Sequence, residues 1–237
     1  MKKIIQLIIF GLITNFTFSQ TQQDFFNQSD EFFKNNVSLD GKIKYSGLKK
    51  SPGELLYIIN NVSKLDIQPL ANDTKIAFWI NAYNLLVIRN VLDNYPVRSV
   101  NFITDFFDKK FQIANGEFTL NEIENILHDL IKDPASHFIL CNGANGSSKL
   151  LNSAYLPETV RYQISYQMKS TINKLGFIKV NKDNKSVELP LVFEIHKKDF
   201  ITQYYNQLDF LNVFLDKKLD NKLQITFAKF DLSLNEI

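Results

Sequence analysis

The most constraining feature of this chain is one long segment, residues 74–94, that is apolar on nearly every side of the helix it would form. Asp73 is suited to cap the start of such a helix, and Pro96 cannot continue it. A helix that is hydrophobic all round has no face to turn toward water, so the rest of the domain must enclose it. We therefore predict a buried central helix. Its apolar residues are Ile76, Ala77, Phe78, Trp79, Ile80, Leu85, Leu86, Val87 and Ile88.

The segments on either side of this helix predict an α+β fold. Periodic apolar residues and capping residues predict further helices over 24–35, 51–62, 120–131, 157–175 and parts of 192–219. Turn signals predict hairpins around 40–41, 115–116 and 183–184, and a last strand is predicted over 222–229. The fold class is therefore a helix-rich single domain with a buried central helix and a small, mostly antiparallel sheet built from hairpins.

The N-terminus has the pattern of a signal peptide. Lys2 and Lys3 precede an apolar segment of about 15 residues, 4–18, which is short for a membrane span. Small side chains at Thr17 and Ser19 predict cleavage after Ser19. The alternative is an uncleaved membrane anchor. The polar residues inside this short segment argue against that alternative. We expect a signal peptide over 1–19 and an exported protein, periplasmic or secreted.

The rest of the chain, residues 20–237, is expected to form a single globular domain with no transmembrane segment. The whole chain has 27 basic and 25 acidic residues, and removal of Lys2 and Lys3 leaves 25 of each. A neutral chain offers no electrostatic attraction to nucleic acid or to an anionic membrane. The chain has one cysteine and three histidines without zinc-ligand spacing, and it has no phosphate loop, so we expect no metal and no cofactor.

Two asparagines lie on one face of the predicted central helix. Asn81 and Asn84 are three residues apart in the sequence Phe78-Trp79-Ile80-Asn81-Ala82-Tyr83-Asn84. Burying two side-chain amides is costly unless their hydrogen bonds are satisfied. Either these amides brace a loop by bonding its backbone, or they point at a ligand. The bracing interpretation is favoured, because most side-chain hydrogen bonds go to backbone or water.

The chain resembles the family known as domain of unknown function 547. The resemblance rests on the segments 78–84, 120–125, 137–143, 198–200 and 231–235, together with Asp40-Gly41 and Tyr45. These segments occur in the family's order and span nearly all of residues 20–237. The resemblance implies a shared fold and an exported or envelope setting. It implies no established reaction.

Cys141 is the one candidate nucleophile of the thiol type. It is predicted to end a buried strand, 137–141, and to enter a loop, 142–148, whose amides from Gly143 to Ser147 are suited to bind an anion. The alternative is a small buried hydrophobe, which is the commoner state of a free cysteine. On a strand, His137 and Cys141 would lie about 13 Å apart, so they would form no catalytic pair. His137 is then a structural histidine that bonds the central helix or the loop.

Glu124 is the candidate general acid or base. It lies on the predicted helix over 120–131, where partial burial would raise its pKa. The alternative, slightly favoured, is a structural carboxylate paired with Arg89 or Arg98. A base for the thiol would have to come from Glu124, His128 or His196.

Two hypotheses for the function remain. The first is a cell-envelope binding module with a pocket for a small molecule, peptide or glycan. Its ligand-binding residues would be Asn81, Asn84, Asn142, Gly143 and Ser147. The second is a cysteine-dependent hydrolase or acyl transferase. Its catalytic residues would be Cys141, His137 and Glu124.

Overall fold

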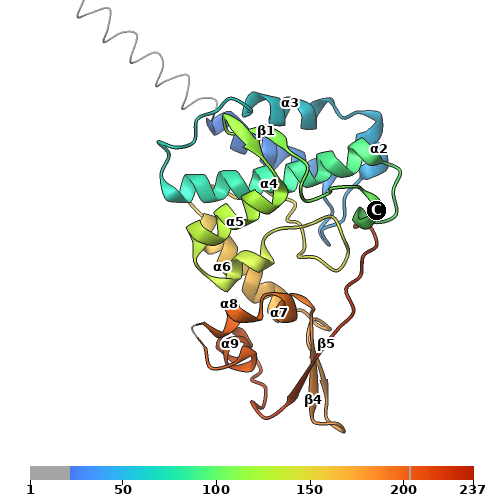
Figure 1. Cartoon of the computed structure of the whole chain (residues 1–237), viewed down its shortest axis with the longest axis vertical. Coiled ribbons are helices and arrows are strands. Elements are labelled where there is room, and N and C mark those ends of the chain that lie inside the picture. The colour runs from blue at the N-terminus through green and yellow to red at the C-terminus, as the bar shows by residue number, and fades with distance from the viewer. Residues whose placement is uncertain (1–21, 203) are drawn as a thin grey trace, which may run out of the picture.

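The computed structural model describes residues 22–202 and 204–237 (Figure 1). The predicted signal peptide, residues 1–19, lies outside the described residues. None of the helices among the described residues combines the length and the hydrophobicity that a membrane span needs.

The central helix is α4 (Asn72–Asn94), and the prediction of its burial is confirmed. Its side chains are buried almost without interruption from Ile76 to Leu92. The helix begins slightly earlier than predicted, and its N-cap residue is Ala71 rather than Asp73. The carboxylate of Asp73 instead pairs with Arg161, with 2.8 Å between Oδ1 and Nε. The capping prediction was wrong because this side chain has a partner from another helix.

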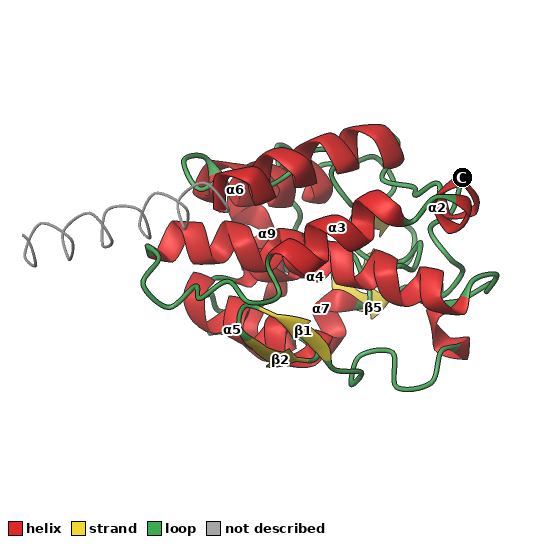
Figure 2. Cartoon of the chain, turned by 90° about the horizontal axis from the view of Figure 1, so that it is seen from above, coloured by secondary structure: helices red, strands yellow, loops and turns green. Residues whose placement is uncertain are grey.

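Further helices surround α4 (Figure 2). Besides a helix over residues 22–36, they are α2 (Tyr45–Lys50), α3 (Gly53–Asn61), α5 (Leu120–Ile131), α6 (Val160–Ile172), α7 (Val192–Ile195), α8 (Lys197–Ile201) and α9 (Gln207–Phe214). Two 3₁₀ turns, η1 (Val100–Phe102) and η2 (Pro134–Phe138), join them. Helices α2, α3, α5 and α6 contact α4 directly, so its apolar surface is covered from several sides.

The strands form two small sheets in the described residues. One is the hairpin β1 (Phe111–Ile113) with β2 (Gly116–Phe118), and the other has the order β3 (Lys179–Asn181), β4 (Ser186–Leu189), β5 (Gln224–Phe227). Both hairpins were predicted, and the α+β class is confirmed. The pairing of β4 with β5 is parallel. The predicted strands around Asp40-Gly41 amount to a single bridge between Val37 and Ile43.

The segment predicted as a strand, 137–141, is not one. Pro134–Phe138 forms η2, and the chain continues from there as a loop. The side chain of Asp133 caps the turn by accepting a hydrogen bond from the amide of Ala135 at 2.8 Å, and Pro134 occupies its first turn. A short apolar run is compatible with either a strand or a buried helical turn, and the Asp-Pro start decides for the turn.

The last described residues return to the helical part of the molecule. The amide of Leu234 donates to the carbonyl of Arg98, and the amide of Asn235 donates to the carbonyl of Gly143, each at 2.9 Å. The amide of Ile43 in turn donates to the carbonyl of Asn235 at 2.9 Å. In Figure 1 this segment runs upward from β5 and ends near α2. It therefore ties the C-terminal sheet to the N-terminal half of the fold.

A pocket beside a histidine cluster as the candidate functional site

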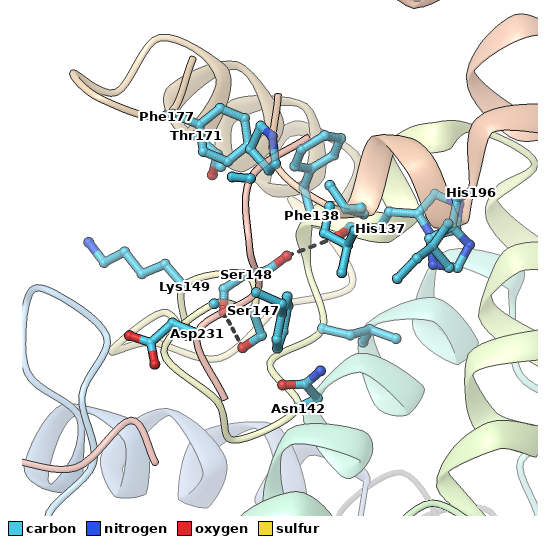
Figure 3. A pocket seen from close by; sticks show the side chains of 18 of the residues that line it. His137, Phe138, Asn142, Ser147, Ser148, Lys149, Thr171, Phe177, His196 and Asp231 are labelled. Atoms are coloured by element: carbon cyan, nitrogen blue, oxygen red, sulfur yellow. Dashed lines mark hydrogen bonds between the residues drawn. The ribbon is translucent and has the colours of Figure 1, made fainter. Parts of the chain in front are cut away.

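A cavity of about 1060 Å³ lies where the helical part meets the C-terminal elements. Its wall includes residues of α5, η2, the loop 142–149, the end of α6, the strand β4 and the turn 228–231. Figure 3 shows His137 and His196 side by side on one side of this pocket, with Ser147 and Ser148 at the centre of the view and Asn142 below them. The pocket thus collects segments that are far apart in the sequence.

The lining is mixed in chemistry. Side-chain amides and hydroxyls come from Asn125, Asn142, Ser170 and Thr171 among others, and aromatic rings come from Phe107, Phe177 and Phe230. Lysines and acidic residues both occur in the wall, and one such pair, Lys179 and Glu188, is closed at 2.7 Å. The pocket is therefore polar without a strong excess of one charge.

Asn81 and Asn84 brace backbone and do not line this pocket. The side chain of Asn81 donates to the carbonyl of Tyr155 at 2.8 Å and accepts from the amide of the same residue at 2.9 Å. The Oδ1 atom of Asn84 accepts from the amide of Cys141 at 3.1 Å. Both amides are buried, and their hydrogen bonds hold the segments after α5 against α4.

The loop after Cys141 contributes some of its predicted ligand-binding residues to the pocket. Asn142 and Ser147 line the cavity, whereas Gly143 lies behind it. Gly143 is buried with φ of +84°, and a Cβ atom there would lie 3.0 Å from Cγ1 of Val100. Glycine is thus required for the close approach of this loop to the helical core.

The loop amides do not form an anion site. The amides of Asn145 and Gly146 each donate at 2.8 Å to carbonyls of Ser233 and Asp231, respectively. The amide of Ser147 donates to the carbonyl of Ala144 at 3.1 Å. These donors are already used within the protein, so the expected anion-binding role is not supported by the geometry.

Cys141 lies behind the pocket wall. It is 2% exposed and is not part of the lining. Its Sγ atom lies 3.4 Å from Oγ of Ser147 and accepts a hydrogen bond from Nδ2 of Asn235 at 3.2 Å. Burial raises the pKa of the thiol, and the bonds from these neighbours only partly offset it. No histidine or carboxylate bonds the sulfur in the described residues, so the thiol has no base.

His137 is held by Asp199 and not by the central helix. Its Nε2 atom lies 2.9 Å from Oδ2 of Asp199, and its backbone carbonyl accepts a hydrogen bond from Ser148 at 2.9 Å. The ring of His196 stacks on it at 3.8 Å between centroids, and the ring of His128 lies 5.9 Å away. Burial, together with the charge of His196, lowers the pKa of His137 to about 4, so the ring is neutral near pH 7.

Glu124 lines the pocket one helical turn before His128. The expected ion pair with Arg89 or Arg98 is absent: Arg89 pairs with Asp93 at 2.7 Å, and Arg98 makes no ion pair among the described residues. Among the described residues the Glu124 carboxylate has no hydrogen-bond or ion-pair partner. Burial raises its pKa, and the nearby His128 opposes that rise. Glu124 is thus an unpartnered carboxylate in a partly buried setting.

The histidine cluster was not predicted from the sequence. All three histidines of the chain lie together, although 68 positions separate the first from the last in sequence numbering, from His128 to His196. We expected no metal site because the histidines are far apart along the chain. In the folded protein they lie close together. One signal was available, since His137 and Asp199 belong to two of the segments on which the family resemblance rests.

Comparison with known proteins supports that resemblance. Residues 67–171 match the family model described as "Protein of unknown function, DUF547". No curated protein and no solved structure matches the chain. The matched region contains α4, α5, η2 and almost all of α6, and with them Glu124, His137 and Cys141. Residues 67–171, which supply much of the pocket wall, therefore match the DUF547 family of proteins of unknown function.

Proposed function

We propose that this protein is an exported binding module whose pocket takes a glycan. The observation that carries the proposal is the cavity of about 1060 Å³, lined by amides, hydroxyls and aromatic rings. Small-molecule pockets are typically about 300–1,000 Å³, so this one has room for several sugar units. Its near balance of acidic and basic side chains suits an uncharged, polar ligand.

Several polar groups in the wall are available to a ligand. The side chains of Asn125, Ser170 and Thr171 make no hydrogen bond to the described residues. An amide offers both donors and an acceptor, and a hydroxyl offers one donor and two lone pairs. Sugar hydroxyls need partners of both kinds. The rings of Phe107, Phe177 and Phe230 offer apolar faces for the C–H faces of a sugar ring.

The alternative of a cysteine-dependent hydrolase or acyl transferase gains no support from the surroundings of Cys141. A thiol nucleophile needs a lowered pKa and access to substrate. Burial acts in the opposite direction on Cys141, and the sulfur lies outside the cavity. Glu124 and His137 do line the cavity, but neither contacts the thiol. We therefore prefer the binding function.

A matched pair of variants on α6 tests the pocket. Ser170 lines the cavity and Ser165 does not, while both are exposed and lie on the same helix. Ser170→Trp fills part of the pocket without removing a hydrogen bond. We expect it to weaken the binding of a tetramer of N-acetylglucosamine about tenfold, a loss of about 1.4 kcal/mol. Ser165→Trp should bind as the wild type does, with both affinities measured by titration calorimetry.

Two results would contradict this proposal. One is the absence of binding to N-acetylglucosamine, cellulose and mannose oligomers alike. The other is binding to soluble cell-wall peptides but to none of these sugars, which would make the protein a peptide-binding module. Equal affinities of the two tryptophan variants would place the binding site elsewhere on the surface.

The export of the protein is tested separately. The lysine start and short apolar segment of residues 1–18 support cleavage after Ser19. We expect the intact mass of protein from the envelope fraction to correspond to a chain that begins at Gln20. Ile8→Lys, which interrupts the apolar segment, should leave the precursor uncut. A mature protein that retains Met1 would contradict this prediction.

A further inference from the structure

The chain brings all three of its histidines and two carboxylates into one cluster. His128 comes from α5, His137 from η2 and His196 from the junction of α7 and α8. Glu124 precedes His128 by one helical turn, and Asp199 lies on α8. Imidazole nitrogens and carboxylate oxygens are the ligands that first-row transition metals bind in proteins.

Two groups of three within this cluster have the geometry of a metal site. In the group of Glu124, His137 and His196, one ligand atom from each residue lies within 4.8 Å of the others. The same holds for the group of His128, His137 and Asp199. Both groups contain His137, so the contacts of this residue decide between them.

The contacts of His137 favour the first group. Its Nε2 atom is engaged by Asp199 at 2.9 Å, and its Nδ1 atom has no hydrogen-bond partner among the described residues. A histidine that binds a metal almost always donates its other nitrogen to a carboxylate or carbonyl, which fixes the tautomer and the ring orientation. Asp199 is placed to do this, and it then acts as the outer partner of a ligand.

The position of the pocket favours the same group. Glu124, His137 and His196 all line the cavity of about 1060 Å³, whereas His128 and Asp199 do not. An ion held by these three residues would have its remaining coordination positions open to the pocket. Three protein ligands with an open position are the arrangement of zinc sites that bind water or substrate.

The first group also has room to close around an ion. With bonds of about 2.0–2.2 Å, ligand atoms in a tetrahedral zinc site lie about 3.3 Å apart. The atoms here lie within 4.8 Å of one another. Because the rings of His137 and His196 are stacked, the partly exposed ring of His196 has to turn out of the stack for both nitrogens to face one ion. Glu124 loses no hydrogen bond by rotating, because it makes none in the described residues. The buried hydroxyl of Ser136, beside His137 in the lining, is likewise without a partner.

We propose that Glu124, His137 and His196 bind a divalent transition-metal ion of the zinc class at the wall of the pocket. Two imidazoles and one carboxylate disfavour Mg²⁺ and Ca²⁺, which prefer oxygen ligands alone. The open position faces the cavity, where it binds water or an oxygen atom of the pocket's ligand. The site does not depend on the identity of that ligand, and it goes beyond the proposed binding of a glycan.

The test uses the full chain after signal removal, without an affinity tag that contains histidine. After dialysis against a chelator, Zn²⁺ is titrated in competition with a chromophoric chelator, and Co²⁺ is added as a spectroscopic probe. We expect one Zn²⁺ ion per chain and a visible Co²⁺ spectrum of the tetrahedral type. Failure of the intact chain to bind either ion above the level of a nonspecific control protein would overturn the proposal.

Variants then assign the ligands. Glu124→Gln keeps the shape of the side chain. Both Glu124→Gln and His196→Ala should weaken Zn²⁺ binding about 100-fold, which is the upper end of the loss seen when a metal ligand loses its outer partner. Asp199→Asn should weaken it about tenfold by releasing the ring of His137. His128→Ala is the matched control from the other group and should bind as the wild type does. Weak binding in His128→Ala with full binding in Glu124→Gln would overturn the assignment.

The metal and glycan experiments are separable. The chelator-treated chain is also titrated with the sugar oligomers, so a loss of metal binding and a loss of glycan binding are observed independently. Circular dichroism of each variant shows that the fold is kept. Glu124→Gln is the most informative variant in this respect, because it removes no hydrogen bond and no ion pair between described residues.

Discussion

The side chain of Asn81 pairs with backbone groups in the way that a neighbouring β-strand does. It satisfies both backbone polar groups of Tyr155, one as donor and one as acceptor, inside the core. A buried backbone amide or carbonyl without a partner is costly, so the segment at Tyr155 depends on this single side chain. The conformation of the chain before α6 is thus set by one residue of α4.

We expect Asn81→Ala to lower the free energy of unfolding by about 2–4 kcal/mol, because it leaves two buried groups of Tyr155 unpaired. Asn60→Ala is the matched control. Asn60 is also helical, but its side chain is exposed and makes no hydrogen bond in the described residues. Urea titration measures both. A change below about 0.5 kcal/mol for Asn81→Ala would contradict the bracing role.

The thiol of Cys141 should react slowly in the native protein. Its burial raises the pKa, so the thiolate is scarce at neutral pH, and the sulfur is 2% exposed. We expect the rate of alkylation by iodoacetamide at pH 7 to rise at least about 100-fold on unfolding, since labelling then no longer waits for rare opening. Native labelling at pH 6 that outruns labelling of the unfolded chain would make Cys141 a nucleophile candidate again.

At the scale of elements, the loop 142–149 is held between α4 and the C-terminal segment. Gly143 packs against Val100, and Gly146 lies so close to Asp231 that a Cβ atom would be 2.7 Å from its amide nitrogen. The loop therefore has little freedom, although part of it lines the pocket. A pocket wall of this kind would be preorganised for the proposed ligand.

Two glycines have nearly the same φ angle but different surroundings. Alanine substitutions at these two positions therefore distinguish the cost of backbone strain from the cost of overpacking. Gly143 has φ of +84° and Gly176 has φ of +83°, but only the first has neighbours within 4 Å of a Cβ atom. Gly176→Ala should cost about 1–2 kcal/mol from the left-handed conformation alone. Gly143→Ala should cost a further 1–3 kcal/mol, roughly, from overpacking. Equal losses in thermal unfolding would contradict the packing argument.

The elements that were predicted well from the sequence are determined by residues close together along the chain. The hairpin at Asn115-Gly116 and the start of α5 were foreseen because turn residues and a capping box lie within a few positions. The hydroxyl of Thr119 accepts from the amide of Glu122 at 3.1 Å, and the carboxylate of Glu122 accepts from the amide of Thr119 at 2.8 Å. Such signals need no knowledge of the tertiary structure.

The site was harder to predict because its causes are not local. The pairing of His137 with Asp199 depends on how η2 and α8 pack, and no spacing within either segment reveals it. Asn142 and Ser147, predicted from their position in a loop to bind a ligand, line the pocket, and their role in binding stays a prediction. His196 was considered only as a base for Cys141, since nothing in the sequence indicated that it stacks on His137.

For the whole molecule, Asn235 is the point where distant parts of the chain meet. Its Oδ1 atom accepts from the hydroxyl of Tyr45 at 3.1 Å, and its Nδ2 atom donates to Cys141 at 3.2 Å. Both partners are buried. This one side chain therefore links the N-terminal region, the loop beside the pocket and the C-terminal segment.

We expect Asn235→Ala to lower the free energy of unfolding by about 1–3 kcal/mol, because it leaves the buried hydroxyl of Tyr45 without a partner. Leu232→Ala is the control in the same segment, since Leu232 is 43% exposed. Thermal unfolding measures both losses. Equal effects of the two variants would mean that the hydrogen bonds of Asn235 add nothing to the packing of the segment.

The return of residues 231–237 to the region of Ile43 and Tyr45 has a consequence for biosynthesis. A ribosome makes Tyr45 190 positions before it makes Asn235. Until Asn235 has been made, the amide of Ile43 and the hydroxyl of Tyr45 lack the partner that each has in the folded protein. Contacts between such distant positions slow folding. The hydrogen bonds that join residues 43–45 to Asn235 therefore form only after the 190 positions that follow Tyr45 have been made.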